Sequence, residues 1–317
     1  MRPTDVLDPA TLSRIGSMEL RARLIVEGFI TGLHKSPYHG FSVEFAEHRP
    51  YNAGDELRHV DWKVYARTDR PYVKRYEEET NLRHWVVLDT SPSMRYAGRQ
   101  GVSKLDVAAS ISAALHLLMQ RQRDATGLAA FDEDVHTLMP PKSSARYVRA
   151  LLATLGDLAE DPPRPERKRT DAAHALGALA ERIGRRALVV VVSDLFENAG
   201  ADGLDGLEEQ ADRVLRALRH LRHRGHEVLV LHVLDEATER RFDFPDRPVR
   251  LKDAETGETM TVQPAQLREA YAEAADEYLG RFRRRCREMQ VDFVPIDTAR
   301  PFADALAAYL QKRRRLH

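Results

Sequence analysis

The sequence predicts an α/β fold, a doubly wound and mostly parallel sheet with helices on both faces, preceded by a small N-terminal module. Two observations point to this class. From about residue 85 onward, short β-branched runs alternate with amphipathic segments of helical period, as in a parallel sheet covered by helices. The composition, 43% hydrophobic and 31% charged over 317 residues, is that of a globular protein with one large domain or one domain and a smaller module.

Residues 1–84 differ from the rest of the chain, so we expect them to form the separate module. An amphipathic helix is predicted near residues 18–31. Short segments rich in aromatic, arginine and acidic residues follow it, without helical period. The remainder, residues 85–317, is predicted to form the sheet domain.

The sheet domain is expected to alternate buried strands with helices. Strands are predicted at residues 85–88, 127–131, 187–192, 228–234 and 291–296. Helices are predicted at residues 104–122, 145–158, 171–183, 207–222, 264–289 and 301–314. In helix 171–183 the apolar residues fall three and four apart, so one face packs on the sheet.

Two hairpins depart from this alternation. The short connection 132–134 separates strand 127–131 from residues 135–139 and predicts an antiparallel pair at one edge of the sheet. A second hairpin is predicted near 249–262, with its turn at Glu255, Thr256 and Gly257, and we interpret it as an insertion in the sheet domain.

The strongest chemical signal is the segment VVLDTSPSM at residues 86–94. Its apolar strand ends at Asp89, and ligands of open α/β sheets bind at the carboxyl ends of the strands. Residues two apart in an extended segment point the same way, so Ser91 and Ser93 present both hydroxyls toward the Asp89 carboxylate. Such hard oxygen donors suit Mg²⁺ or Mn²⁺ better than zinc or copper.

Two further oxygen donors stand at matching structural positions. Thr170 is expected at the cap of a predicted helix, and Asp194 lies just beyond the end of a predicted strand. Two carboxylates and three neutral hydroxyls leave the octahedral coordination of a cation one ligand short. A carboxylate from a partner protein can therefore complete the octahedron.

These five residues resemble the metal-ion-dependent adhesion site of the von Willebrand A domain, whose motif is DxSxS, a loop threonine and a late aspartate. The resemblance implies that Ser91 and Ser93 ligate the ion directly. It also implies that Asp89, Thr170 and Asp194 contribute directly or through water.

A plainer interpretation is that the two serines only cap the helix after the first strand of the sheet, and that Asp194 only caps the next one. Under that interpretation the fold is indifferent to magnesium and survives Asp89→Ala.

The segment before the first sheet strand mixes opposite charges and aromatic rings at unusual density. We expect a tight turn around Gly54, which is free to take a positive φ. Arginine beside aspartate predicts partly buried salt links, with Trp62 packed beneath them. The residues that form this series are Arg49, Tyr51, Gly54, Asp55, Arg58, Asp61, Trp62 and Arg67.

This series, placed directly before a von Willebrand A-like domain, is similar to the bacterial family called domain of unknown function 58. The resemblance runs from about residue 18 through the C-terminal helix. Members of that family are typically associated with MoxR-type AAA+ ATPases, so the resemblance implies such a partner, recruited by this protein or directed by it toward clients. No residue spacing indicates that partner by itself.

Several other classes of function receive no support. Lysine plus arginine and aspartate plus glutamate both number 49, so no net charge draws the chain to nucleic acid, and the basic runs 281–287 and 312–315 are interpreted as solvated faces. The single Cys286 allows no intramolecular disulfide. The apolar run 187–192 is too short to span a membrane and the N-terminus lacks a signal-peptide pattern, so we expect a cytoplasmic protein.

The function predicted from the sequence is that of a non-enzymatic, magnesium-dependent adaptor that engages an AAA+ ATPase or its client through an acidic side chain. Two alternatives stay open. One is a metal-dependent phosphohydrolase in which the cation polarises a phosphoryl oxygen, although the sequence offers no clear base or nucleophile motif. The other is a scaffold with a vestigial metal site.

Overall fold

The computed structural model describes most of the chain. The described residues are 8–34, 48–50, 62–70, 72–74, 83–160, 171–184, 186–195, 203–254, 256–302, 306–307, 309–310 and 312. They form two compact units: one comprises Met1–Gly32 with Leu82–His317, and the other is Leu33–Asn81.

The larger unit is built on a six-stranded sheet with the strand order β10-β7-β6-β3-β4-β5. Every neighbouring pair is parallel except β4 and β5. The strands are β3 (Arg83–Asp89), β4 (Ala125–Phe131), β5 (Val135–Lys142), β6 (Ala187–Ser193), β7 (Glu227–Leu234) and β10 (Asp292–Asp297). The predicted α/β class is therefore confirmed, and the antiparallel edge pair is where the short 132–134 turn predicted it.

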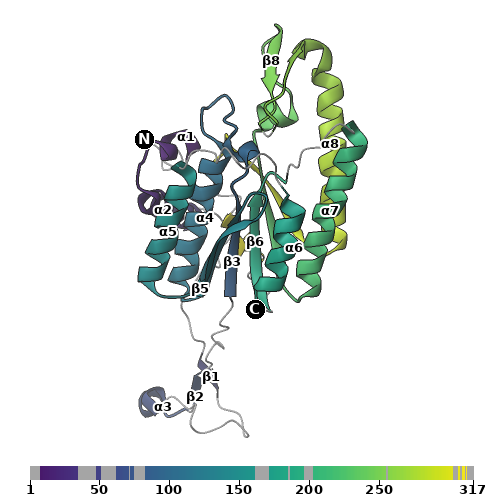
Figure 1. The fold of residues 1–317 in the computed structure, drawn as a ribbon. Coiled ribbons are helices and arrows are strands. Elements are labelled where there is room, and N and C mark those ends of the chain that lie inside the picture. Colours follow the sequence, from purple (N-terminus) through teal and green to yellow (C-terminus); the bar gives the residue numbers. More distant parts are fainter. Residues whose placement is uncertain are drawn as a thin grey trace. The chain divides into compact units, whose positions relative to one another are not determined.

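Helices cover both faces of the sheet (Figure 1). One face carries α4 (Lys104–Arg121) and α5 (Ala145–Glu160), and the other carries α6 (Ala172–Arg182), α7 (Gly203–His223) and α8 (Pro264–Glu288). Trp85 and Val87 of β3 belong to the core on the α6 and α7 side. Because side chains alternate along a strand, the equally buried Val86 and Leu88 face α4.

Two N-terminal helices belong to the sheet unit. α1 (Pro9–Ser13) and α2 (Met18–His34) bury Leu12, Ile25 and Val26. Arg21 of α2 forms an ion pair with Asp106 of α4, with 2.5 Å between Nη1 and Oδ1. The predicted module boundary at residue 84 thus differs from the division by contacts, which leaves only residues 33–81 outside the sheet unit.

The smaller unit holds β1 (His48–Pro50), α3 (Trp62–Thr68) and β2 (Tyr72–Lys74). β1 and β2 pair antiparallel, with Arg49 opposite Val73. The helix α3 was not predicted, because its sequence WKVYART lacks an apolar stripe of helical period.

Two further elements follow β7. Glu236–Arg240 form a single π-helical turn, η5, which is too short to leave a periodic signal in the sequence. The hairpin expected near 249–262 is present as β8 (Val249–Lys252) paired antiparallel with β9 (Thr259–Val262). Of the helix predicted at 301–314, residues 306, 307, 309, 310 and 312 are helical, whereas residues 301 and 302 are not, so the predicted start at 301 is wrong.

Candidate cation site at the carboxyl edge of the sheet

Asp89 ends strand β3 and is completely buried. Its Oδ1 accepts a hydrogen bond from the backbone N–H of Ser91 at 2.9 Å, and its Oδ2 accepts one from the hydroxyl of Ser193 at 2.5 Å. The second contact follows from the register, because β3 and β6 run parallel with Leu88 beside Val192. Both carboxylate oxygens are therefore held in place by neutral donors.

Ser91 and Ser93 lie at the start of a short 3-10 turn, Pro92–Arg95. Their Oγ atoms are 3.1 Å apart. Two ligands at right angles around Mg²⁺, each at about 2.1 Å, would lie about 3 Å from one another. The Ser91 hydroxyl forms no cap hydrogen bond with the turn, so the interpretation of this serine as a simple helix cap is wrong.

Asp194 follows the last residue of β6 and is also buried. Its Oδ2 accepts a hydrogen bond from the Lys104 ammonium at 2.7 Å. The described part of α7 begins at Gly203, and residues 196–202, between Asp194 and that helix, lie outside the described residues. The structure thus brings Asp89, Ser91, Ser93 and Asp194 to one edge of the sheet.

Thr170, the fifth predicted donor, lies outside the described residues. Its neighbour Asp171 is described and caps α6 by accepting a hydrogen bond from the His174 N–H at 2.8 Å. The backbone N–H of Asp171 also donates to the carbonyl of Asp132, at the end of β4, at 3.4 Å. Helix α6 therefore begins at the same edge of the sheet as the other predicted donors.

The N-terminal series is described only in part. Arg49 lies in β1, and Trp62 and Arg67 lie in α3, where Arg67 is exposed. The side chain of Trp62 is not described. The remaining members of the series, which are Tyr51, Gly54, Asp55, Arg58 and Asp61, lie outside the described residues.

Three residues that the sequence did not single out complete the cluster. Ser193 holds Asp89, Lys104 holds Asp194, and Glu239 of the π-helical turn accepts a second hydrogen bond from Lys104. The other oxygen of Glu239 accepts from the backbone N–H of Asp235 at 2.7 Å. A lysine at a helix start carries no signal of burial in the sequence, so only the fold reveals these contacts.

Burial and charge shift the pKa values of this cluster strongly. Burial, and after it the nearby charge of Asp194, raise the pKa of Asp89 to about 7, against the lowering effect of the hydrogen bonds from Ser193 and Ser91. Burial lowers the pKa of Lys104, but the charges of Asp194 and Glu239 outweigh it, so the net pKa is raised. The carboxylates thus crowd one another, and a cation would relieve that repulsion.

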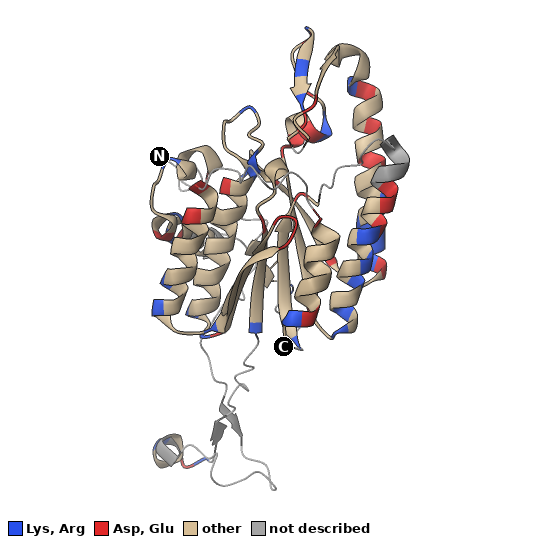
Figure 2. Cartoon of the chain, viewed as in Figure 1, with Lys and Arg blue, Asp and Glu red and all other residues tan. Residues whose placement is uncertain are grey.

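The donor set fits a hard divalent cation by its chemistry. It offers carboxylates and hydroxyls, the oxygen ligands that Mg²⁺ and Mn²⁺ prefer. In the described part of the chain, no three histidine, cysteine, aspartate or glutamate side chains gather in a group that could hold a metal ion. Figure 2 shows acidic residues in the loops beyond the strand ends at this edge of the sheet.

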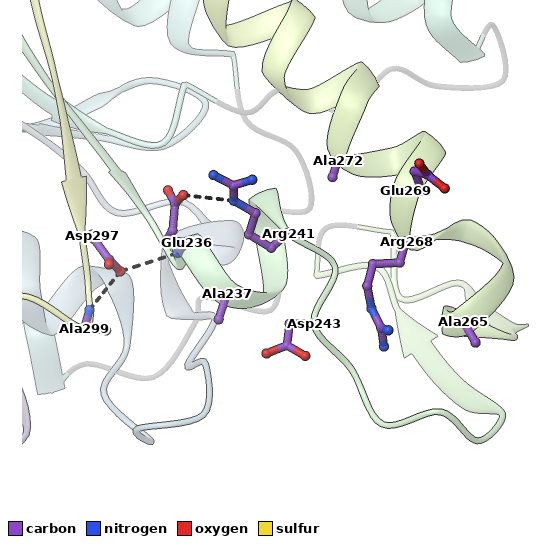
Figure 3. Close-up of a pocket in the computed structure, with 10 residues that line it drawn as sticks. All are labelled: Glu236, Ala237, Arg241, Asp243, Ala265, Arg268, Glu269, Ala272, Asp297 and Ala299. Carbon is purple, nitrogen blue, oxygen red and sulfur yellow. Dashed lines mark hydrogen bonds and ion pairs between the residues drawn. The ribbon is translucent and has the colours of Figure 1, made fainter.

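A cavity of about 760 Å³ lies beside this edge (Figure 3). Its lining residues are Glu236, Ala237, Arg241, Asp243, Ala265, Arg268, Glu269, Ala272, Asp297 and Ala299. Both arginines are already paired: Arg241 Nε lies 3.3 Å from Glu236 Oε1, and Arg268 Nη2 lies 2.6 Å from Asp246 Oδ1. The cavity therefore shares the π-helical turn with the cluster but offers no uncompensated cation.

The fold and the site together define the class of protein. A doubly wound, mostly parallel sheet with strand-end carboxylates and paired serine hydroxyls at its carboxyl edge is a von Willebrand A-like α/β domain. A family model described as "Protein of unknown function DUF58" matches residues 47–279, and the chain belongs to this family. The predicted family resemblance is thereby confirmed.

Comparisons with known proteins show several similar chains. The uncharacterised protein Rv1480 of Mycobacterium tuberculosis is 28% identical over 314 residues, which cover 98% of this chain and 92% of that protein. The solved structure of the conserved hypothetical protein BatB from Bacteroides thetaiotaomicron is similar with a TM-score of 0.44 and 16% identity, covering 74% of this chain and 99% of that one. The SpRpn10 VWA domain is similar with a TM-score of 0.35 and 9% identity, covering 71% and 93%.

Among the helices described, none is long and apolar enough to cross a membrane.

Proposed function

We propose that this chain is a non-enzymatic binding protein that uses a divalent cation, Mg²⁺ or Mn²⁺, to engage an acidic side chain of a partner protein. The observation that supports this most is the 3.1 Å separation of the Ser91 and Ser93 hydroxyl oxygens beside the buried Asp89. The two hydroxyls would ligate the ion. Asp89 and Asp194 would supply the negative charge that holds it, with Thr170 as a further donor.

The cation supplies one kind of chemistry when bound: it attracts a negatively charged oxygen ligand. The chain's own residues fix the donor geometry. The Ser193 hydroxyl and the Ser91 N–H orient the two oxygens of Asp89, and the short turn after Ser91 sets the serine spacing. Since the hydroxyls are neutral, the ion keeps positive charge with which an incoming carboxylate forms a charge-assisted bond.

The partner that we propose is a MoxR-type AAA+ ATPase or one of its clients. This part of the proposal rests on the family's association with such ATPases, and a cytoplasmic location accords with it.

The double variant Ser91→Ala/Ser93→Ala tests the site. Isothermal titration with Mn²⁺ is expected to show binding to the natural chain and an affinity at least about tenfold weaker in the variant, the loss that even outer-shell partners of a metal can cause. Pull-down of the cognate ATPase is expected to require Mg²⁺ and to fail with the same variant.

Thr90→Ala is the matched control, because the Thr90 hydroxyl donates to the Phe131 carbonyl at 2.9 Å and pairs with the His136 ring instead of with the two serines.

Equal Mn²⁺ affinity in the natural chain and the double variant would contradict the proposed site. Magnesium-dependent hydrolysis of a generic phosphate ester, lost in the double variant, would replace the adaptor with the phosphohydrolase. No Mn²⁺ binding at millimolar concentration would favour the scaffold.

A further inference from the structure

Lys104 is the most unusual residue of the cluster. It begins helix α4, yet its side chain is only 2% exposed. Lysine is almost never buried without partners, because an unpaired ammonium loses its hydration. Here the ammonium donates to Asp194 at 2.7 Å and to Glu239, and it lies 5.8 Å from the centre of the Tyr96 ring.

The ammonium shares its carboxylate with the proposed cation site. Asp194 is one of the residues that would hold the divalent ion, and the charge of Asp194 also acts on Asp89. When all are ionised, the three carboxylates Asp89, Asp194 and Glu239 with the one ammonium sum to a formal charge of −2, which a single divalent cation neutralises. Without the ammonium, one further negative charge would face the ion.

We propose that Lys104 is a built-in counter-cation that sets the divalent-ion affinity of this site, an inference that rests on the proposed function. Its fixed positive charge, 2.7 Å from Asp194, repels an ion that shares this carboxylate, and buried charges are poorly screened. The same charge compensates Asp194 when no ion is bound. The chain therefore folds without the ion and binds it weakly enough to release it.

Lys104→Met tests the inference, since it removes the charge and keeps an unbranched apolar stem. Isothermal titration with Mn²⁺ is expected to show at least tenfold tighter binding in this variant than in the natural chain. Its melting temperature is expected to fall in the presence of a chelator and to recover with Mn²⁺, because the ion then replaces the ammonium beside Asp194. Arg99→Gln is the control: Arg99 is 57% exposed and pairs with Asp243 at the surface, so its loss should leave Mn²⁺ affinity within twofold.

Each outcome separates this inference from the proposed function. Equal or weaker Mn²⁺ binding in Lys104→Met, with binding intact in the natural chain, overturns the role of Lys104 and leaves the site. Binding in the variant alone supports the role of Lys104 and overturns metal dependence of the natural chain. Binding in neither overturns both.

A second variant decides the matter if Lys104→Met, which leaves buried carboxylates unpaired, does not fold. Glu239→Gln keeps the ammonium and removes one of its two compensating charges, at a side chain that is 30% exposed. Because Lys104 then repels the ion with less compensation, Mn²⁺ affinity should fall at least threefold. Unchanged or tighter binding overturns the inference.

Discussion

At the scale of single residues, the carboxyl edge of the sheet depends on a close contact between Gly98 and Asp235, which no sequence motif indicates. Gly98 precedes α4, and a Cβ atom built on it would lie 1.8 Å from Asp235 Oδ2. The carboxylate cannot easily move away, because Oδ1 of Asp235 accepts hydrogen bonds from the Thr238 N–H at 2.8 Å and the Thr238 hydroxyl at 2.6 Å. Only glycine fits at position 98.

Gly98→Ala should therefore lower the free energy of unfolding by about 1–3 kcal/mol, the usual cost of overpacking, as measured by urea denaturation. Gly177→Ala is the control, since Gly177 lies in α6 with no atom within 4 Å of the added Cβ. That change should stabilise the chain by roughly 0.5–1 kcal/mol, because alanine loses less conformational freedom in a helix. A stable Gly98→Ala variant would show that Asp235 is free to move.

At the scale of elements, Arg21 joins α2 to the sheet unit. Besides its ion pair with Asp106, its guanidinium donates to the Ile15 carbonyl at 2.5 Å and the Ser13 carbonyl at 2.8 Å. The side chain is 9% exposed, so its partners would be left buried if it were removed. A single arginine thereby fixes the loop between α1 and α2 and also the packing of α2 on α4.

Arg21→Ala should destabilise the chain by about 3 kcal/mol, since breaking a largely buried ion pair leaves an uncompensated charge. Arg23→Ala is matched in helix and chemistry, but Arg23 is 57% exposed and its ion pair among the described residues is with Glu19 one turn away, so its loss should cost less than about 0.5 kcal/mol. Thermal unfolding of both variants measures the difference. Equal effects would mean that α2 contributes little to the sheet unit.

At the scale of the whole molecule, a buried histidine makes folding sensitive to acid. His116 of α4 contacts the Thr126 hydroxyl at 2.6 Å, between the helix layer and β4. Burial, together with the nearby charge of His84, lowers the pKa of His116 to about 3. Between that value and the ordinary pKa of about 6.5, the unfolded chain binds a proton that the folded chain does not.

The stability that neutral His116 contributes is thus fully present above about pH 6.5 and is lost as the pH falls, by up to about 1.4 kcal/mol per pH unit. Urea denaturation between pH 6.5 and 5 should show a shallower loss for His116→Gln than for the natural chain. His174→Gln, which changes a histidine ring that is 61% exposed, is the surface control. If the natural chain and both variants lose stability equally as the pH falls, the acid sensitivity is caused by groups other than His116.

The sequence by itself determined the strands, most helices and the spacing of Asp89, Ser91 and Ser93. These features are local, because apolar runs, helical period and two-residue alternation each depend on a few neighbouring residues. The short elements α1, α3 and η5 escaped prediction because they are too brief or too polar to show a period.

Only the tertiary structure decided what surrounds the donors. Lys104 contacts Asp194, 90 residues away in the sequence, and Glu239, 135 residues away. Ser193 contacts Asp89 at a sequence separation of 104 residues. It also assigned α1 and α2 to the sheet unit through Arg21 and Asp106. Such contacts arise because parallel strands place their carboxyl ends at one edge of the sheet, where buried charges need partners. No local sequence pattern indicates which residues those partners are.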